Sequence, residues 1–255
     1  MSRFRRVLAV ALSGTLLLGV AACSESGRTA GEQDPSAQAD AGPRALTSEE
    51  AQRLSMMRFR NFSAGERAVQ FSVEQSGTTF AVSGWFDFHA CLGYGLLTAP
   101  SQSWLIGWTD EQISSVAWDP GQSAPLPVPT NIRWEPAPLQ PDDQLVEAVL
   151  GLLCALSADR PGNSLILAQS DARWLESKAA DGVQLDIIAG PTSDEAAGSA
   201  DAEDTGGATT RYAIDQTGLL HHVDLRLGSA AEWTRVSLSA ADEDVAFEKN
   251  DLGLG

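Results

Sequence analysis

Apolar and polar residues alternate along much of this chain, and the longest alternating region predicts a β-hairpin. The region runs from residue 69 to residue 88, and Gln75-Ser76-Gly77 forms a turn in its middle. Every second residue of a strand points to the same side of a sheet, so one face of the hairpin should be apolar and buried. That face comprises Val69, Phe71, Val73, Phe80, Val82, Phe86 and Phe88.

A second hairpin is predicted by the alternation in residues 104–108 and 113–118, which the polar pair 110–111 separates. Gly93 and Gly95 interrupt the pattern between the two hairpins, and we expect a β-bulge there.

The next region is rich in proline, with seven of the 12 prolines between residues 120 and 141. Proline lacks a backbone N–H and fixes φ, so this stretch excludes regular helix and allows at most a short edge strand at Ile132 to Trp134.

Two segments have helical spacing. The first should run over 48–60 and end at Asn61, because the Thr47 hydroxyl and the Glu50 carboxylate form a capping box at its start. The second should run over 142–157, capped by Asp142 or Asp143. Its apolar positions are Leu145, Val149, Leu152, Leu153 and Leu156.

The C-terminal part predicts a short turn of helix after Asn163, a hairpin of two strands near 172–177 and 183–187, and a three-stranded meander. The meander strands are expected at 211–215, 219–227 and 233–238. Residues 190–209 are mostly small or acidic, so we expect a disordered internal loop there.

Sequential strands joined by short turns favour an antiparallel sheet. We therefore predict an α+β domain over residues 46–250, with the two amphipathic helices covering one face of the sheet and the other face wet.

The first 45 residues predict export and lipidation. Residues 1–22 have the basic start and short apolar core of a signal peptide, and Val20-Ala21-Ala22-Cys23 matches the lipobox of bacterial lipoproteins. Cys23 is then the lipidation site, and residues 23–45 form a disordered tether with a reach of roughly 26 Å. These features place the domain at the extracytoplasmic face of the cell membrane. Plain secretion with an incidental cysteine is the alternative.

Charge argues against nucleic-acid binding and against adsorption to anionic membranes. The chain carries 34 Asp and Glu against 17 Lys and Arg, a net charge of −17. A chain this acidic repels phosphate backbones and anionic headgroups.

Two cysteines remain after Cys23, and an oxidising compartment favours a disulfide between Cys91 and Cys154. A metal site or a thiol nucleophile is the alternative, but neither cysteine has a CxxC partner. The bridge would join the second helix to the long hairpin.

Other candidate chemistry is weak. His221 and His222 are adjacent and would point to opposite faces of a strand, and His89 has only Cys91 nearby. The seven tryptophans favour packing over a shared ligand site. The chain has no HExxH, GxSxG or phosphate-loop motif, so we expect no enzyme, no cofactor and no metal.

The order of elements behind a lipobox resembles the LppX/LprG-type lipoproteins of actinobacteria over residues 46–240. Residues 46–61 are similar to that family's opening helix, and Val82 to Asp87 to its second-strand Gly-x-x-Asp. Tyr212 to Leu219 resembles its W-x-D-x-x-G-L hairpin, with Tyr212 replacing the usual Trp. A disulfide departs from the family's common pattern. The resemblance implies a LolA-like fold, a strongly curved antiparallel sheet that forms an unclosed barrel with helices on its concave face. It also implies binding of acylated lipids between sheet and helices.

Two functions of different classes follow. The first is a lipid-binding carrier or scaffold of the cell envelope, with a cavity of roughly 300 to 1,000 Å³ between helices and sheet. Its candidate lipid-contacting face is Phe71, Val73, Phe80, Val82, Phe86 and Phe88. The second is a non-enzymatic interaction module with a packed core and no lipid cavity, which presents its acidic loop or tryptophan-bearing edges to another envelope protein.

Overall fold

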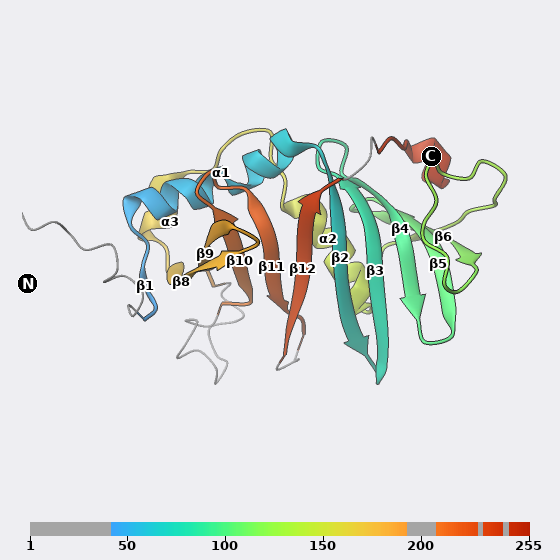
Figure 1. Ribbon diagram of the computed structural model, residues 1–255, viewed down its shortest axis with the longest axis horizontal. Helices are drawn as coiled ribbons and strands as arrows, with labels where there is room; N and C mark the ends of the chain where they lie inside the picture. Colours follow the sequence, from blue (N-terminus) through green and yellow to red (C-terminus); the bar gives the residue numbers. More distant parts are fainter. Residues whose placement is uncertain (1–41, 193–207, 229–231, 242–244) are drawn as a thin grey trace, which may run out of the picture. The chain divides into compact units, whose positions relative to one another are not determined.

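The computed structural model describes residues 42–192, 208–228, 232–241 and 245–255 (Figure 1). The helices are α1 (Ser48–Ala64), α2 (Leu145–Ala155), α3 (Ser164–Gln169) and the 3-10 helix η2 (Lys249–Leu252). The strands are β1 (Arg44–Ala45), β2 (Glu66–Gln75), β3 (Thr78–Asp87), β4 (Leu92–Ala99), β5 (Gln102–Trp108), β6 (Gln112–Trp118), β7 (Glu135–Pro138), β8 (Arg173–Ala180), β9 (Val183–Ala189), β10 (Thr210–Asp215), β11 (Leu220–Arg226) and β12 (Trp233–Ala240).

Several predicted features lie outside the described residues: the signal peptide, Cys23, most of the tether and most of the 190–209 loop. Within the described part of the chain, no helix has the length and apolar character needed to cross a membrane.

The twelve strands form one antiparallel sheet in the order β1-β8-β9-β10-β11-β12-β2-β3-β4-β5-β6-β7. The sheet is open, because β1 and β7 lie at its two ends and do not pair with each other. Two consecutive arrays of strands, β2 to β7 and β8 to β12, meet where β12 pairs with β2 and Val236 lies opposite Phe71. The predicted α+β class with a curved, unclosed antiparallel sheet is confirmed.

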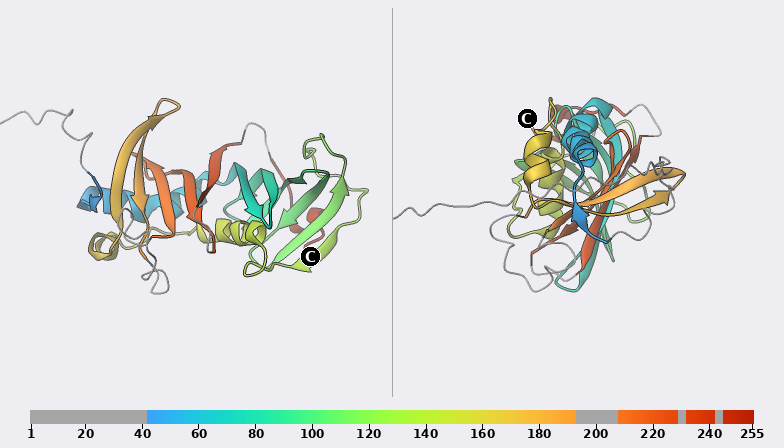
Figure 2. Two further views of the ribbon diagram at one scale, coloured as in Figure 1. Left: turned by 90° about the horizontal axis from the view of Figure 1, so that it is seen from below. Right: turned by 90° about the vertical axis from the view of Figure 1, so that its left-hand side faces the viewer.

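α1 and α2 lie on the concave face of the sheet and cover different halves of it (Figure 2). α1 packs against β10 and β11, whereas α2 packs against β2. Both helices contribute to the main hydrophobic core, with Leu54 and Met57 from α1 and Val149 and Leu153 from α2. The sheet and the helices therefore share one core along this face.

The capping box at Thr47 and Glu50 is present, but α1 does not end at Asn61. Asn61 is fully buried, and its side-chain amide donates to the carbonyl of Leu156 over 2.9 Å. The helix continues to Ala64 and ends at Gly65, whose positive φ of 67° suits glycine. Asn61, which the sequence pattern placed at the end of the helix, instead lies inside α1 and makes a tertiary hydrogen bond.

The predicted cap of α2 is also wrong. Neither Asp142 nor Asp143 caps the helix, which begins at Leu145. The backbone N–H of Leu145 instead donates to the side-chain carbonyl of Gln75, at the end of β2, over 2.9 Å. A residue distant in sequence therefore supplies the acceptor that helix starts require.

The expected bulge at Gly93 and Gly95 does not occur, because β4 pairs with β3 in continuous register. Both glycines are needed for close packing instead. A Cβ at Gly93 would overlap the Trp108 ring, and a Cβ at Gly95 would lie 2.8 Å from the Cα of Gly84. Small residues here allow a large ring and a neighbouring backbone to approach the sheet.

The opposite face of β3 to β6 is covered, contrary to the prediction of a wet face. Leu92, Tyr94, Leu96 and Leu105 form a second core on this side. The proline-rich segment and the C-terminal residues pack over it with Val128, Leu252 and Leu254. The domain therefore extends past residue 250, and the proline-rich segment forms its edge strand, β7, slightly later than expected.

Candidate ligand-binding site

The six residues of the predicted lipid-contacting face come together in the main core. Five of the side chains are buried, and Phe80 is half-buried and packs against the same cluster. Phe86 is the most enclosed: its ring is 4.9 Å from that of Phe88 and 6.0 Å from that of Trp108, between centroids. None of the six lines the cavity described below. Contact between this face and a ligand stays a prediction.

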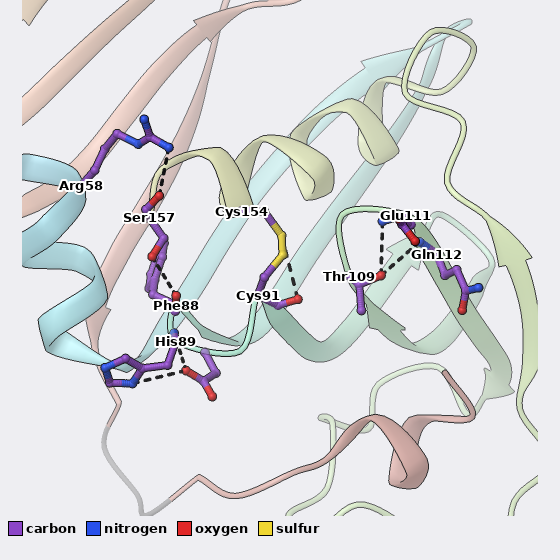
Figure 3. Close-up of a disulfide and its surroundings, with 10 residues drawn as sticks. Arg58, Phe88, His89, Cys91, Thr109, Glu111, Gln112, Cys154 and Ser157 are labelled. Atoms are coloured by element: carbon purple, nitrogen blue, oxygen red, sulfur yellow. Dashed lines mark hydrogen bonds and ion pairs between the residues drawn. A yellow bond between two sulfur atoms is a disulfide. The ribbon is translucent and has the colours of Figure 1, made fainter. Parts of the chain in front are cut away.

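Cys91 and Cys154 are joined by a disulfide, with their Cα atoms 5.2 Å apart (Figure 3). The bridge links α2 to the turn between β3 and β4. Beside it, the Ser157 hydroxyl donates to the carbonyl of Phe88 over 2.7 Å, and Arg58 of α1 donates to the carbonyl of Ser157 over 3.0 Å. The segment after α2 is therefore held to both the sheet and α1.

The two adjacent histidines have different surroundings. His221 pairs with Asp215 over 3.1 Å, whereas His222 is buried on the other face of β11. Burial, followed by the positive charge of Arg235, lowers the pKa of His222 to about 4. Cys91 and Cys154 lie near Asp110, but a disulfide offers no thiolate to a metal.

An apolar cavity of about 460 Å³ lies between α1, α3 and the segment that joins α2 to α3. Its size falls within the roughly 300 to 1,000 Å³ typical of small-ligand sites. It is lined by Leu54, Ser55, Met57, Arg58, Ala158, Arg160, Pro161, Gly162, Asn163, Ile166, Leu167, Pro191 and Tyr212. Hollows of about 500 and 700 Å³ lie elsewhere, but both have acidic and basic side chains in their walls.

Backbone hydrogen bonds build one wall of this cavity. The N–H of Ala158 donates to the carbonyl of Arg58 over 3.2 Å, and the N–H of Gly162 donates to that of Ser55 over 2.8 Å. The connecting segment therefore runs along α1 instead of filling the space beside it. At the far end, Asn163 caps α3 by accepting hydrogen bonds from the first backbone N–H groups of that helix.

α1, which also lines the cavity, is held to the sheet by a partly buried ion pair. Arg53 contacts the Asp186 carboxylate on β9 at 2.6 Å, and the Trp174 indole N–H donates to the same carboxylate over 3.2 Å. Tyr212 of β10 also lines the cavity. Because backbone hydrogen bonds and this ion pair fix the walls, the cavity is part of the fold.

The charge of the cavity is opposite to that of the chain. Arg58 and Arg160 are among the lining residues, and no lining residue is acidic, although the whole chain has a net charge of −17. Both arginines are exposed, so they lie where the cavity opens to solvent. The arrangement is apolar inside and cationic at its mouth, which suits an amphiphile with an anionic group.

One lining residue, Ile166, and its neighbour Leu165, which does not line the cavity, are exposed apolar side chains. Leu165 and Ile166 of α3 have 71% and 65% of their surfaces accessible, whereas the next residue, Leu167, packs against the core. The sequence pattern predicted this helix but did not indicate the cavity beside it. The available signal was the run of three aliphatic residues, which is more than one short helix can bury on one side.

Comparison with known proteins finds matches among solved structures. No family model and no curated protein matches the chain. Among solved structures, the crystal structure of the Mycobacterium tuberculosis lipoprotein LppX matches with probability 1.00, a TM-score of 0.43 and 16% sequence identity. The match covers 78% of this chain and 98% of LppX. It does not assign the chain to a family.

Proposed function

We propose that this domain is a lipid-binding carrier or scaffold of the cell envelope, anchored through Cys23, and that it holds an amphiphile in the cavity between α1 and α3. The observation that carries the proposal is a preformed apolar space of about 460 Å³ with two arginines at its mouth. The acyl chain would contact Leu54, Met57 and Leu167. Its headgroup would lie beside Arg58 and Arg160.

The free energy of such binding comes mainly from the acyl chain of the ligand. Each CH₂ group that leaves water contributes about 0.8 kcal/mol, so shortening a bound acyl chain by two carbons should weaken binding by about 15-fold. The arginines would add selectivity for anionic headgroups, because their charge is exposed and can approach a phosphate or carboxylate without a large desolvation penalty.

The test is mass spectrometry of lipids extracted from the purified chain, together with titration of a fatty-acid series. Leu167→Trp places a large ring in the cavity and should reduce lipid retention and abolish the chain-length dependence. Ala168→Trp is the matched control, because Ala168 is exposed on the same helix and does not line the cavity. Equal retention in both variants would refute binding at this site.

A packed interaction module is the second candidate, and one observation favours it. The face that sequence analysis assigned to acyl chains is filled by its own side chains, with Phe86 fully buried and Val82 1% exposed. If no lipid is recovered from the wild-type chain and no fatty acid binds, this second function is supported and the first is wrong.

A further inference from the structure

The exposed apolar pair at Leu165 and Ile166 is unusual for a surface. Within the described residues, they are the two large hydrophobic side chains that are exposed, and they are adjacent in α3. A six-residue helix needs only one apolar side for packing, and Leu167 already provides it. The outer side of α3 therefore presents apolar surface without an internal partner among the described residues.

The position of α3 indicates what covers this surface. Three residues after α3 the chain enters β8, and Arg173 at the start of β8 lies opposite Ala45 of β1. The described chain begins at residue 42, so α3 lies at the end of the domain where the N-terminal segment enters (Figure 1). The predicted tether reaches roughly 26 Å from Cys23, which would hold this end close to a bilayer.

We propose that α3 docks on the membrane surface, with Leu165 and Ile166 entering the boundary between headgroups and acyl chains. This proposal rests on the proposed function, because it would place the cavity mouth, which Ile166 also lines, against the lipid source. Arg160 would face the phosphate layer.

Apolar insertion, not charge, is the driving force in this proposal. The chain has a net charge of −17, and Arg160 has the Asp159 carboxylate 4.0 Å away. Anionic lipids should therefore weaken docking or leave it unchanged, whereas an electrostatic surface would bind them more strongly.

The experiment uses the full chain in phosphatidylcholine vesicles, with an environment-sensitive dye on Ala168→Cys. Ala168 lies three residues after Leu165 and therefore on the same side of α3. A dye on Ser239→Cys, an exposed position of β12, is the control. A blue shift at 168 without one at 239 is expected, and Leu165→Gln should lower the docked fraction by about tenfold, because one aliphatic side chain no longer leaves water. Leu165→Phe should preserve docking.

The outcomes separate docking from lipid binding. Leu165 does not line the cavity, so Leu165→Gln should leave lipid retention unchanged. Retained lipid without a dye shift at position 168, in the chain that keeps Leu165, would overturn docking and leave the proposed function intact. A shift without retained lipid would refute the proposed function and support docking. A shift that requires anionic vesicles, or a dimer in solution that protects the dye, would overturn apolar insertion.

Discussion

Val82→Trp tests whether the aromatic face beneath the helices is packed or open. Val82 is 1% exposed in β3, opposite Phe71 of β2, and belongs to the main core. The indole ring has no free volume to enter, so it should force neighbouring side chains from their preferred rotamers. Overpacking of this kind costs about 1–3 kcal/mol of unfolding free energy. In a domain of this size, that loss lowers the melting temperature by about 3–10 °C.

The assay is urea unfolding, with Ser83→Trp as the matched control. Ser83 is the next residue of β3, and its exposed side chain points to the opposite face. The same ring should therefore change the unfolding free energy by less than about 0.5 kcal/mol there. If Val82→Trp is as well tolerated as Ser83→Trp, the face contains open space and the packing argument is refuted. Loss of bound lipid in that variant would then place the acyl chain on this face.

Three other predictions concern groups away from the cavity. Denatured chain lacking Cys23 should show almost no free thiol, and two reactive thiols would show that the Cys91–Cys154 bridge is absent. Replacing both cysteines with Ala should lower the free energy of unfolding by about 4 kcal/mol. His222 binds a proton near pH 4 when folded but near its ordinary pKa of 6.5 when unfolded, so stability should fall by about 2 kcal/mol between pH 7 and pH 5. A denaturation series at both pH values checks this, and an unchanged slope in His222→Gln would contradict it. Cys23→Ala should leave the precursor uncleaved or unacylated. Normal maturation and membrane retention of this variant would refute lipidation at Cys23.

Local patterns predicted most of the elements. The hairpins were predictable because strand alternation and turn residues lie close together in sequence, and the start of α1 because a capping box involves only Thr47 and Glu50. Where a distant residue contributes, the local pattern failed. Gln75 supplies the acceptor at the start of α2, and the carbonyl of Leu156 holds Asn61 inside α1.

The candidate site was not predictable for the same reason. The cavity exists because the segment after α2 is hydrogen-bonded along α1 and because α3 packs beside that helix. Neither of these two contacts produces a periodic pattern of apolar residues in the sequence. Only the surplus of aliphatic residues at Leu165 to Leu167 marked this region, and it indicates exposed apolar surface without showing where a cavity lies.

The pairing of β12 with β2 has a consequence for how the chain folds as it is synthesised. Within each array, neighbouring strands follow one another along the chain, so hairpins can form as the chain emerges. β1, which pairs with β8, is the exception. β2 must wait for residues 236–240, which emerge near the end of the chain. Until then its edge offers unpaired backbone groups to other polypeptides. The Cys91–Cys154 loop ends in α2, before β8 begins, so this disulfide can form before β12 pairs with β2, a long-range contact of the kind that slows folding.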